Sequence, residues 1–190
     1  LTYELPALVL FAILGIPAED VNEVKAGSAD RLQFMFGHAS DHQQVAAAVG
    51  MAEFWRYCEA LAEDRRADPR DDFTSDLVHR QDETGMPLTQ QEVATILFGL
   101  LLAGHETTTN ILGNGLRRLL EHRSSWETIC AHPEAILGAV EEILRFDPPL
   151  HLFTRFARED VEILGHHFRR GDTVGCLLAA ANRDPKRFPA

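Results

Sequence analysis

The residues best suited to chemistry form one run in an otherwise apolar segment, Ala103-Gly104-His105-Glu106-Thr107-Thr108-Thr109. A glycine inside a helix costs about 1 kcal/mol relative to alanine, threonine hydroxyls compete for backbone carbonyls, and a buried carboxylate needs a partner. Such locally unfavourable choices are typical of functional sites. The run predicts a helix opened near Gly104, where a flat ligand or small molecule can approach the backbone. The Thr107 hydroxyl would hydrogen-bond there, and Glu106 would supply protons from solvent.

Two other interpretations of this run stay open. One is a core helix in which the threonines bond back to carbonyls and Glu106 lies at the surface. The other is a zinc protease, because His105-Glu106 begins an HExxH pattern. That pattern requires a histidine at position 109, one turn further on, and the residue there is Thr109. The sequence therefore argues against a metalloprotease.

A second pair of charged groups, Glu142 and Arg145, is spaced three residues apart. This spacing places both side chains on one helix face, where they can pair. Most such pairs lie on the surface and contribute little to stability. The position of this one, directly before Phe146-Asp147-Pro148-Pro149, is what makes it distinctive.

The elements that must position these groups are mainly helices. Thr89-Gln90-Gln91-Glu92 matches the capping-box pattern and opens the longest predicted helix, which would run to about Glu121 and span about 48 Å. Residues 96–103 are apolar on every face, so we expect the middle of this helix to be buried. The other predicted helices cover residues 5–16, 18–36, 41–66 (capped by Asp41), 73–81 (capped by Asp72 or Thr74), 126–131 and 133–146.

The periodicity changes after the two prolines at 148 and 149. Short extended segments separated by glycine turns predict strands at residues 153–157, 161–164, 167–169 and 173–180. The predicted fold class is therefore mainly α with a small antiparallel β-sheet: a helical part over about 1–147 and a β region over about 150–181.

Composition sets limits on location and partners. The chain has 190 residues, 45% hydrophobic and 25% charged, which is the globular average. Its formal net charge of −11 disfavours nucleic acid and anionic membrane surfaces as partners. The apolar run Leu5–Leu14 has no basic segment before it and is too short to span a membrane, so we expect neither a signal peptide nor a membrane span. Three cysteines without CxxC spacing predict reduced thiols in a cytoplasmic protein.

In their order and spacing, these motifs resemble those of the cytochromes P450, the haem-thiolate monooxygenases. The run at 103–108 resembles the central-helix motif A-G-x-(D/E)-T-T, and Glu142-x-x-Arg145 resembles the E-x-x-R helix. Residues 154–161, 171–174 and 180–185 resemble the following strands and short helix of the soluble bacterial members. The resemblance covers essentially the whole chain and implies an incomplete cytochrome P450 fold, with residues 1–190 as the central part of one catalytic domain.

The resemblance implies roles for the central run. Thr107 would hydrogen-bond in the oxygen-binding groove and help to deliver protons during oxygen activation, and Glu106 would feed that relay. Ala103 and Gly104 would form the groove beside haem b. The reaction would be hydroxylation or epoxidation of a small organic substrate, using O2 and electrons from a ferredoxin or flavodoxin-type donor.

It also implies roles outside that run. Arg155 would pair with a haem propionate, and Glu142 and Arg145 would form a buried structural pair behind the haem. Leu150 and Phe153 would line the substrate pocket, together with the loops around residues 34–38.

The main departure from the family concerns iron. The axial ligand of the family is a cysteine in a loop F-x-x-G-x-x-x-C-x-G, and the N-terminal helices of the family also lack a counterpart here. None of Cys58, Cys130 and Cys176 has that loop around it, so each is expected to be a small buried residue, and no residue of this chain is predicted to ligate metal. The alternative function is therefore a truncated, non-catalytic helical fragment or binding module that does not ligate haem iron by itself.

Overall fold

The computed structural model describes residues 2–25, 40–81 and 84–189. The chain divides into two compact units, Leu1–Thr109 and Asn110–Ala190, called here the N-terminal and C-terminal units. The described elements are mainly helices followed by short antiparallel strands, which confirms the predicted fold class. Of the helix predicted over 18–36, residues 21–25 are helical. The rest of it, and the pocket loops expected at 34–38, lie outside the described residues.

The N-terminal unit is built from α1 (Leu5–Leu14), α3 (Asp41–Ala67), α4 (Phe73–His79), α5 (Gln90–Ala103) and the first turn of α6 (Glu106–Glu121). Their ends follow from local chemistry. The capping box predicted at Thr89 and Glu92 is present at the start of α5, and Asp72 caps α4 by accepting the Ser75 amide. The cap predicted for α3 was one residue off. Ser40 caps this helix, because its side chain and that of Gln43 bond reciprocally to each other's backbone.

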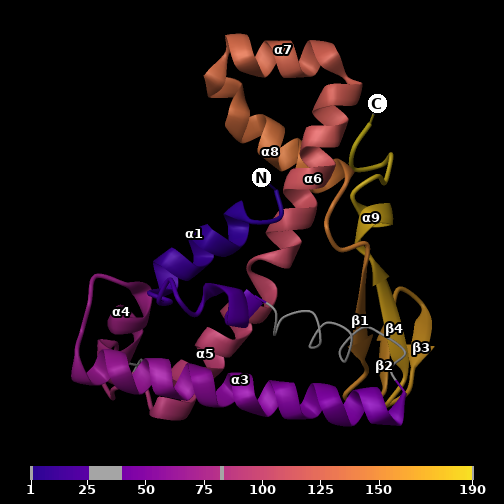
Figure 1. The fold of residues 1–190 in the computed structure, drawn as a ribbon. Helices are drawn as coiled ribbons and strands as arrows, with labels where there is room; N and C mark the ends of the chain where they lie inside the picture. The colour runs from indigo at the N-terminus through magenta and orange to yellow at the C-terminus, as the bar shows by residue number, and fades with distance from the viewer. Residues whose placement is uncertain (1, 26–39, 82–83, 190) are drawn as a thin grey trace. The chain divides into compact units, whose positions relative to one another are not determined.

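The core of the N-terminal unit lies where α3 packs against α4 and α5 (Figure 1). Most of the buried apolar side chains come from four helices and form one cluster with Ile16 and Val24: Ala7, Phe11 and Leu14 from α1; Phe54, Cys58, Leu61 and Ala62 from α3; Leu77 and Val78 from α4; Val93, Ala94, Leu97 and Leu101 from α5. Burial of this apolar surface is the main term that stabilises the unit.

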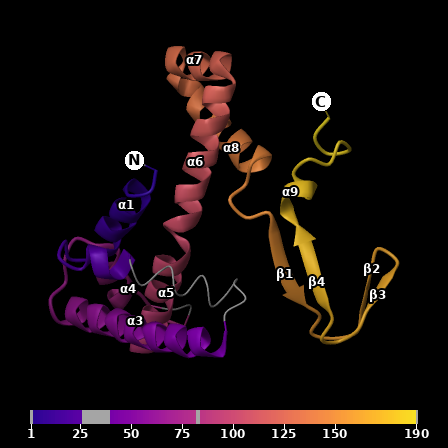
Figure 2. The same ribbon diagram turned by 45° about the vertical axis from the view of Figure 1, so that its right-hand side comes forward.

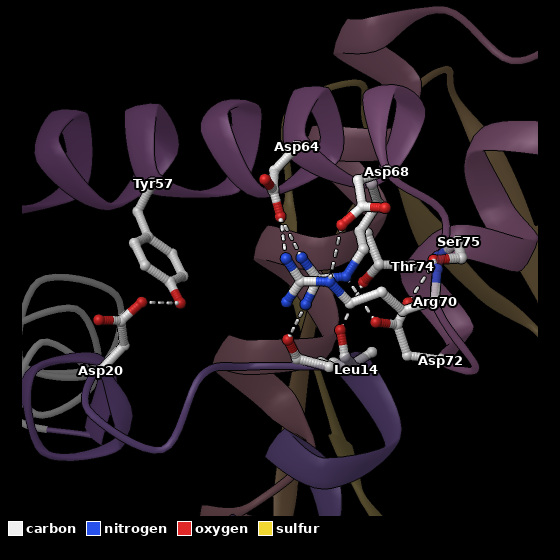
Figure 3. Close-up of polar contacts among 11 residues, drawn as sticks. Leu14, Asp20, Tyr57, Asp64, Asp68, Arg70, Asp72, Thr74 and Ser75 are labelled. Carbon is white, nitrogen blue, oxygen red and sulfur yellow. Dashed lines mark hydrogen bonds and ion pairs between the residues drawn. The ribbon is translucent and has the colours of Figure 1, made fainter.

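Arg65 organises the polar side of this core by bonding to Asp64 and Asp72, both of which are labelled in Figure 3. Its side chain is almost completely buried, and its Nε donates to Asp72 at 2.5 Å, while Nη1 and Nη2 donate to Asp64 and to the carbonyl of Gly15. Burial alone would raise the pKa of Asp72, but the hydrogen bonds from Arg65 and Ser75 lower it. Arg65 therefore ties α3 to the N-cap of α4 and to the end of α1.

Glycine at position 15 is required by both its conformation and its surroundings. It ends α1 with a φ of 70°, and a Cβ there would lie 2.0 Å from Asp72 Oδ2. Next to it, the Thr74 hydroxyl donates to the Leu14 carbonyl at 2.7 Å. The end of α1 is therefore satisfied by groups from α3 and α4.

The C-terminal unit continues α6 and adds α7 (Arg123–Ala131), the 3₁₀ turn η1 (Pro133–Ala135), α8 (Ile136–Phe146) and α9 (Leu178–Ala181). Its strands form two antiparallel pairs (Figure 2). β1 (Leu152–Phe156) pairs with β4 (Thr173–Leu177), and β2 (Val161–Ile163) pairs with β3 (His166–Phe168). The last strand is shorter than predicted, because residues 178–181 turn into α9.

In the described part of the chain, no helix combines the length and apolar character needed to cross a membrane.

Candidate functional site

The central helix is opened where the sequence predicted it. Instead of one helix over 89–121, α5 ends at Ala103 and α6 begins at Glu106, with Gly104 and His105 as a turn between them. On either side of the turn, the Gly104 amide bonds to the Leu100 carbonyl and the Thr109 amide to the His105 carbonyl, both at 2.8 Å. The expectation of a continuous helix was therefore wrong, whereas the predicted opening is present.

Side chains from the start of α6 hydrogen-bond to carbonyls across the opening. Thr107 Oγ1 donates to the Ala103 carbonyl at 2.6 Å, and Thr108 Oγ1 donates to the Gly104 carbonyl at 2.9 Å. Each bond reaches four residues back, as expected for threonines that bond to their own helix. The Thr107 proton is thus held by Ala103, and the lone pairs of its oxygen are left to accept a further hydrogen bond. The structure therefore combines one feature from each of two interpretations: the helix is opened at residues 104–105, and the threonine hydroxyls bond to carbonyls of the preceding turn.

Gly104 is needed for the packing of α1 against the opening. A Cβ at this position would lie 2.7 Å from the Leu100 carbonyl oxygen and 2.9 Å from Leu10 Cδ2. The backbone conformation itself is ordinary, with a φ of −84°. The missing Cβ therefore makes room for a side chain of α1, and the predicted role of Gly104 beside a cofactor stays a prediction.

One face of α5 is exposed to solvent. The expectation that residues 96–103 are buried on every face was wrong, because only Leu97 and Leu101 of this stretch are buried. Gly99 and Ala103 are exposed, and Thr107 follows at the same four-residue step. A Cβ on Gly99 would contact nothing within 4 Å. These small residues leave a flat helix surface that ends at the Thr107 hydroxyl.

In the C-terminal unit, Arg155 lies on β1 with an exposed side chain. Its Nη1 donates to the neighbouring Thr154 carbonyl at 2.9 Å, and its guanidinium lies 4.8 Å from the centre of the Phe153 ring. No carboxylate among the described residues pairs with it. This side chain can therefore still form a charge-assisted bond with an anionic partner. Leu150 lies half-buried in the segment that leads into β1.

The ion pair predicted on α8 is present. Arg145 Nε and Nη2 donate to the two carboxylate oxygens of Glu142 at 2.7 and 2.6 Å, and Arg145 Nη1 donates to the Asn182 carbonyl at 2.8 Å. The hydrogen bonds from Arg145 lower the pKa of Glu142, and the same bonds raise the pKa of Arg145. The pair is not enclosed as expected, since the Glu142 side chain is 59% exposed in this chain.

Sequence reasoning missed Asp147, the one acidic residue buried in the C-terminal unit among those described. Its Oδ2 accepts from Arg118 Nε at 2.8 Å and from Arg117 Nη2 at 2.9 Å, and its carbonyl accepts from Asn114 at 3.2 Å. Burial opposes ionisation, but these arginines, with Arg183, lower the pKa of Asp147. The only sequence signal was its place in the distinctive segment after Arg145.

A cleft of about 470 Å³ lies between α6, α7 and α8 in the C-terminal unit. Its lining is mainly apolar and includes Leu119, Ile129, Ala139, Ile143 and Phe146. Its charged members Arg118, Glu142 and Asp147 are engaged in the ion pairs described above. Ligand sites usually combine apolar walls with polar groups that are free to orient a ligand, so this cleft is a weaker candidate than the opening at Gly104.

The cysteines differ from the expectation that each is buried. Cys58 is buried in α3, but Cys130 and Cys176 are exposed, because α7 buries none of its residues and β4 lies at the surface. Among the described residues, no group of three or more His, Cys, Asp and Glu side chains could hold a metal ion.

Comparison with known proteins gives consistent matches. The family model Cytochrome P450 matches residues 136–190. Polyketide biosynthesis cytochrome P450 PksS of Bacillus subtilis (strain 168) is 37% identical over 185 residues, which are 97% of this chain and 44% of that protein. Vitamin D(3) 25-hydroxylase of Pseudonocardia autotrophica is also 37% identical, over 98% of this chain and 45% of that protein.

The structural comparison agrees with these matches. The solved structure of cytochrome P450 CREJ matches 98% of this chain with a TM-score of 0.89 and 36% identity, over 47% of its own length. The chain thus spans about half the length of the curated relatives it matches.

Proposed function

Because this chain belongs to the cytochrome P450 family, we propose that the protein of which it is a part is a haem-dependent monooxygenase. It hydroxylates or epoxidises a small organic substrate with O2, taking electrons from a ferredoxin or flavodoxin-type donor. The observation that carries this proposal is the opening of the central helix at Gly104–His105, with the Thr107 hydroxyl at its edge. The alternative, a non-catalytic fragment, is not favoured, because the similarity to these relatives extends over nearly the whole chain.

The residues of this chain fit a haem in two respects. The exposed stripe of Gly99 and Ala103 offers a flat surface to a planar ring, and a Cβ at Gly99 would have open space before it. The exposed guanidinium of Arg155, without a carboxylate partner among the described residues, suits a haem propionate. When bound, haem would supply the activation of oxygen, and its iron ligand is expected outside these 190 residues, since none of the three cysteines lies in the family's ligand loop.

We assign proton handling to Thr107 and Glu106. The Thr107 proton is bonded to the Ala103 carbonyl, so its oxygen can accept a proton or hydrogen bond from one side while it donates on the other. Glu106 begins α6 and is half-buried, which lets it exchange protons with solvent. Together they would relay protons into the groove beside Ala103 and Gly104.

The remaining assignments follow the family. Leu150 and Phe153 would line the substrate pocket, and Glu142 and Arg145 would stabilise the fold and take no part in the chemistry. Residues 1–190 would be the central part of one catalytic domain, in a cytoplasmic protein that binds neither nucleic acid nor membrane.

The first test is spectroscopic. The full-length protein, reduced with dithionite under CO, should show the Soret absorption that a thiolate-ligated haem gives. The 190-residue chain reconstituted with haem is the control and should not show it. A full-length protein that binds no haem would overturn the proposal, and a thiolate-type band from the short chain would overturn the placement of the iron ligand.

The second test addresses Thr107. In the full-length enzyme, T107A should consume O2 with little product, a fall in coupling by a factor of about 10 or more. T107S, which keeps the hydroxyl, should recover most of the coupling. T108A removes an equivalent hydroxyl bond one residue further on and serves as the matched control. Tight coupling in T107A, or an equal loss in T108A, would argue against the relay.

A further inference from the structure

We propose that helix α1 fixes the geometry of the opening, with Phe11 and His105 as positioning residues for Thr107. This inference rests on the proposed function and adds to it a control of the same site from the opposite side of α5. All the contacts that carry it lie within the N-terminal unit.

The first contact is between Leu10 and Gly104. Leu10 Cδ2 lies 2.9 Å from the position that a Cβ of residue 104 would take, which is too close for the two atoms to coexist. Helix α1 is therefore packed against the backbone of the opening itself. A shift of α1 toward this turn would press on the peptide groups of Gly104 and His105, because close-packed interiors transmit displacement.

The second contact is between two buried rings. Phe11 is 1% exposed and His105 3% exposed, and their ring centres lie 6.1 Å apart with planes tilted by 58°. This distance and tilt fall within the range of favourable aromatic pairs. The histidine of the turn is thus held between its own helix and α1.

The His105 ring is also fixed to α5. Its Nδ1 lies 3.2 Å from the Leu101 carbonyl oxygen. Because a carbonyl can only accept, Nδ1 carries the proton in this contact. The bond orients the ring along the helix axis, and the contact with Phe11 fixes it from the side.

Thr107 is positioned through this turn. The carbonyl of His105 accepts from the Thr109 amide at 2.8 Å, so the first turn of α6 is built directly on residue 105. Thr107 lies within that turn and bonds back to Ala103 at 2.6 Å. If the His105 ring loses the contacts with Phe11 and Leu101, the turn that carries the Thr107 hydroxyl is free to rewind into a continuous helix. Helix α1 would then control how well protons reach the oxygen groove.

The test uses the full-length, haem-loaded enzyme and four variants: F11L, H105L, the double variant F11L/H105L, and H105N, whose side-chain amide keeps a donor for Leu101. F54L is the matched control, because Phe54 is buried in the same core and contacts Phe98, away from the opening. Two quantities are measured: product formed per O2 consumed, and amide hydrogen exchange of residues 105–109.

We expect F11L and H105L each to accelerate exchange at residues 105–109 by roughly tenfold and to lower coupling several-fold. H105N should recover part of both losses. The double variant should lose less than the sum of the two single variants, because contacting residues are energetically coupled. F54L should change neither quantity locally. If F11L does not fold, Phe11→Met, which nearly conserves volume, replaces it.

Three results would overturn the inference: exchange that rises evenly along residues 90–109 instead of at 105–109, strict additivity of F11L and H105L, or local exchange that changes while the product formed per O2 consumed stays the same. If the wild-type protein gives no thiolate-type spectrum, the proposed monooxygenase function fails. The exchange experiment still decides by itself whether α1 holds the opening.

Discussion

The two units of the chain are stabilised in different ways. In the N-terminal unit, apolar side chains from four helices form one buried cluster, and each of the three guanidinium nitrogens of the buried Arg65 donates to a partner. In the C-terminal unit, no large apolar side chain among the described residues is fully buried. Polar contacts dominate there instead. Asp147 forms ion pairs with Arg117 and Arg118, and the guanidinium of Arg183 lies 4.5 Å from the centre of the Phe146 ring.

Helix α8 makes the difference clearest. Ile136, Val140 and Leu144 recur at four-residue steps, an arrangement that buries a stripe when another element covers it. All three are exposed here, and Leu137 beside them is 80% exposed. Since buried apolar surface supplies most of the stability of a domain, the N-terminal unit should resist unfolding better than the C-terminal unit. The two tryptophans allow this to be measured, because Trp55 lies in α3 and Trp126 in α7.

The largest change in the free energy of unfolding is expected from a substitution of Arg65. In the W126F background, where only Trp55 reports, R65M should destabilise the N-terminal unit by about 3–5 kcal/mol in urea unfolding, because Asp72 would be left buried without its partner. R66M is the control. Arg66 is exposed and donates to Gln90 and to the Leu88 carbonyl, so its loss should cost about 1 kcal/mol or less. Equal losses in the two variants would contradict the central place given to Arg65.

A pair of leucine truncations compares the two units directly. Leu97 is completely buried in α5, so L97A should cost about 2–5 kcal/mol in the Trp55 signal. L137A removes the same atoms from an exposed site on α8 and should change the Trp126 signal by no more than about 0.5 kcal/mol. If L137A proves as costly as L97A, that face of α8 is covered in solution, and the contrast between the units is smaller than the structure indicates.

Features fixed by neighbouring residues could be predicted from the sequence. The capping box at Thr89 and Glu92, the Asp72 cap and the pairing of Glu142 with Arg145 all depend on spacings of three residues, which the sequence displays directly. The opening at Gly104 was also predictable, because glycine followed by three threonines is a poor helix interior.

Features that depend on distant residues could not be predicted. Gly104 is glycine partly because Leu10, far away in sequence, occupies the space of its Cβ. Asp147 is buried because two arginines from α6 reach it, and no local pattern indicates that contact. The exposed face of α5 was missed because an all-apolar segment does not reveal which side has a partner.

The stability of each unit should depend on pH through its own buried carboxylate, Asp72 in the N-terminal unit and Asp147 in the C-terminal unit. Burial raises the pKa of Asp72, but the bonds from Arg65 and Ser75 outweigh it and bring the folded pKa below its ordinary value of 3.8. The unfolded state then binds more protons just below pH 3.8, so the stability that Asp72 provides is present above that pH and is lost as pH falls through its folded pKa.

The variant D72N should abolish the loss of stability at low pH that Trp55 reports for the N-terminal unit. It should leave the loss that Trp126 reports for the C-terminal unit. D147N should do the reverse, since the pKa of Asp147 is also lowered. Both are measured by urea unfolding at a series of pH values below about 5, the upper end of the range in which paired carboxylates lose their stabilising effect. A change of both signals by either variant would mean that the two units unfold as one.

The smallest change in the free energy of unfolding is expected from the Glu142–Arg145 pair on α8. Glu142 and Arg145 form a two-bond ion pair, but the Glu142 side chain is largely exposed, so water and salt screen it. E142Q keeps the shape and one acceptor while removing the charge, and it should cost about 0.2–1 kcal/mol in the Trp126 signal, less at high salt. A salt-independent loss well above that range would mean that the pair is enclosed in solution, as the family resemblance implies. That outcome, together with a costly L137A, would show that α8 is covered over its whole length, because a charge pair and an apolar stripe on one helix lose water only when the same partner excludes it.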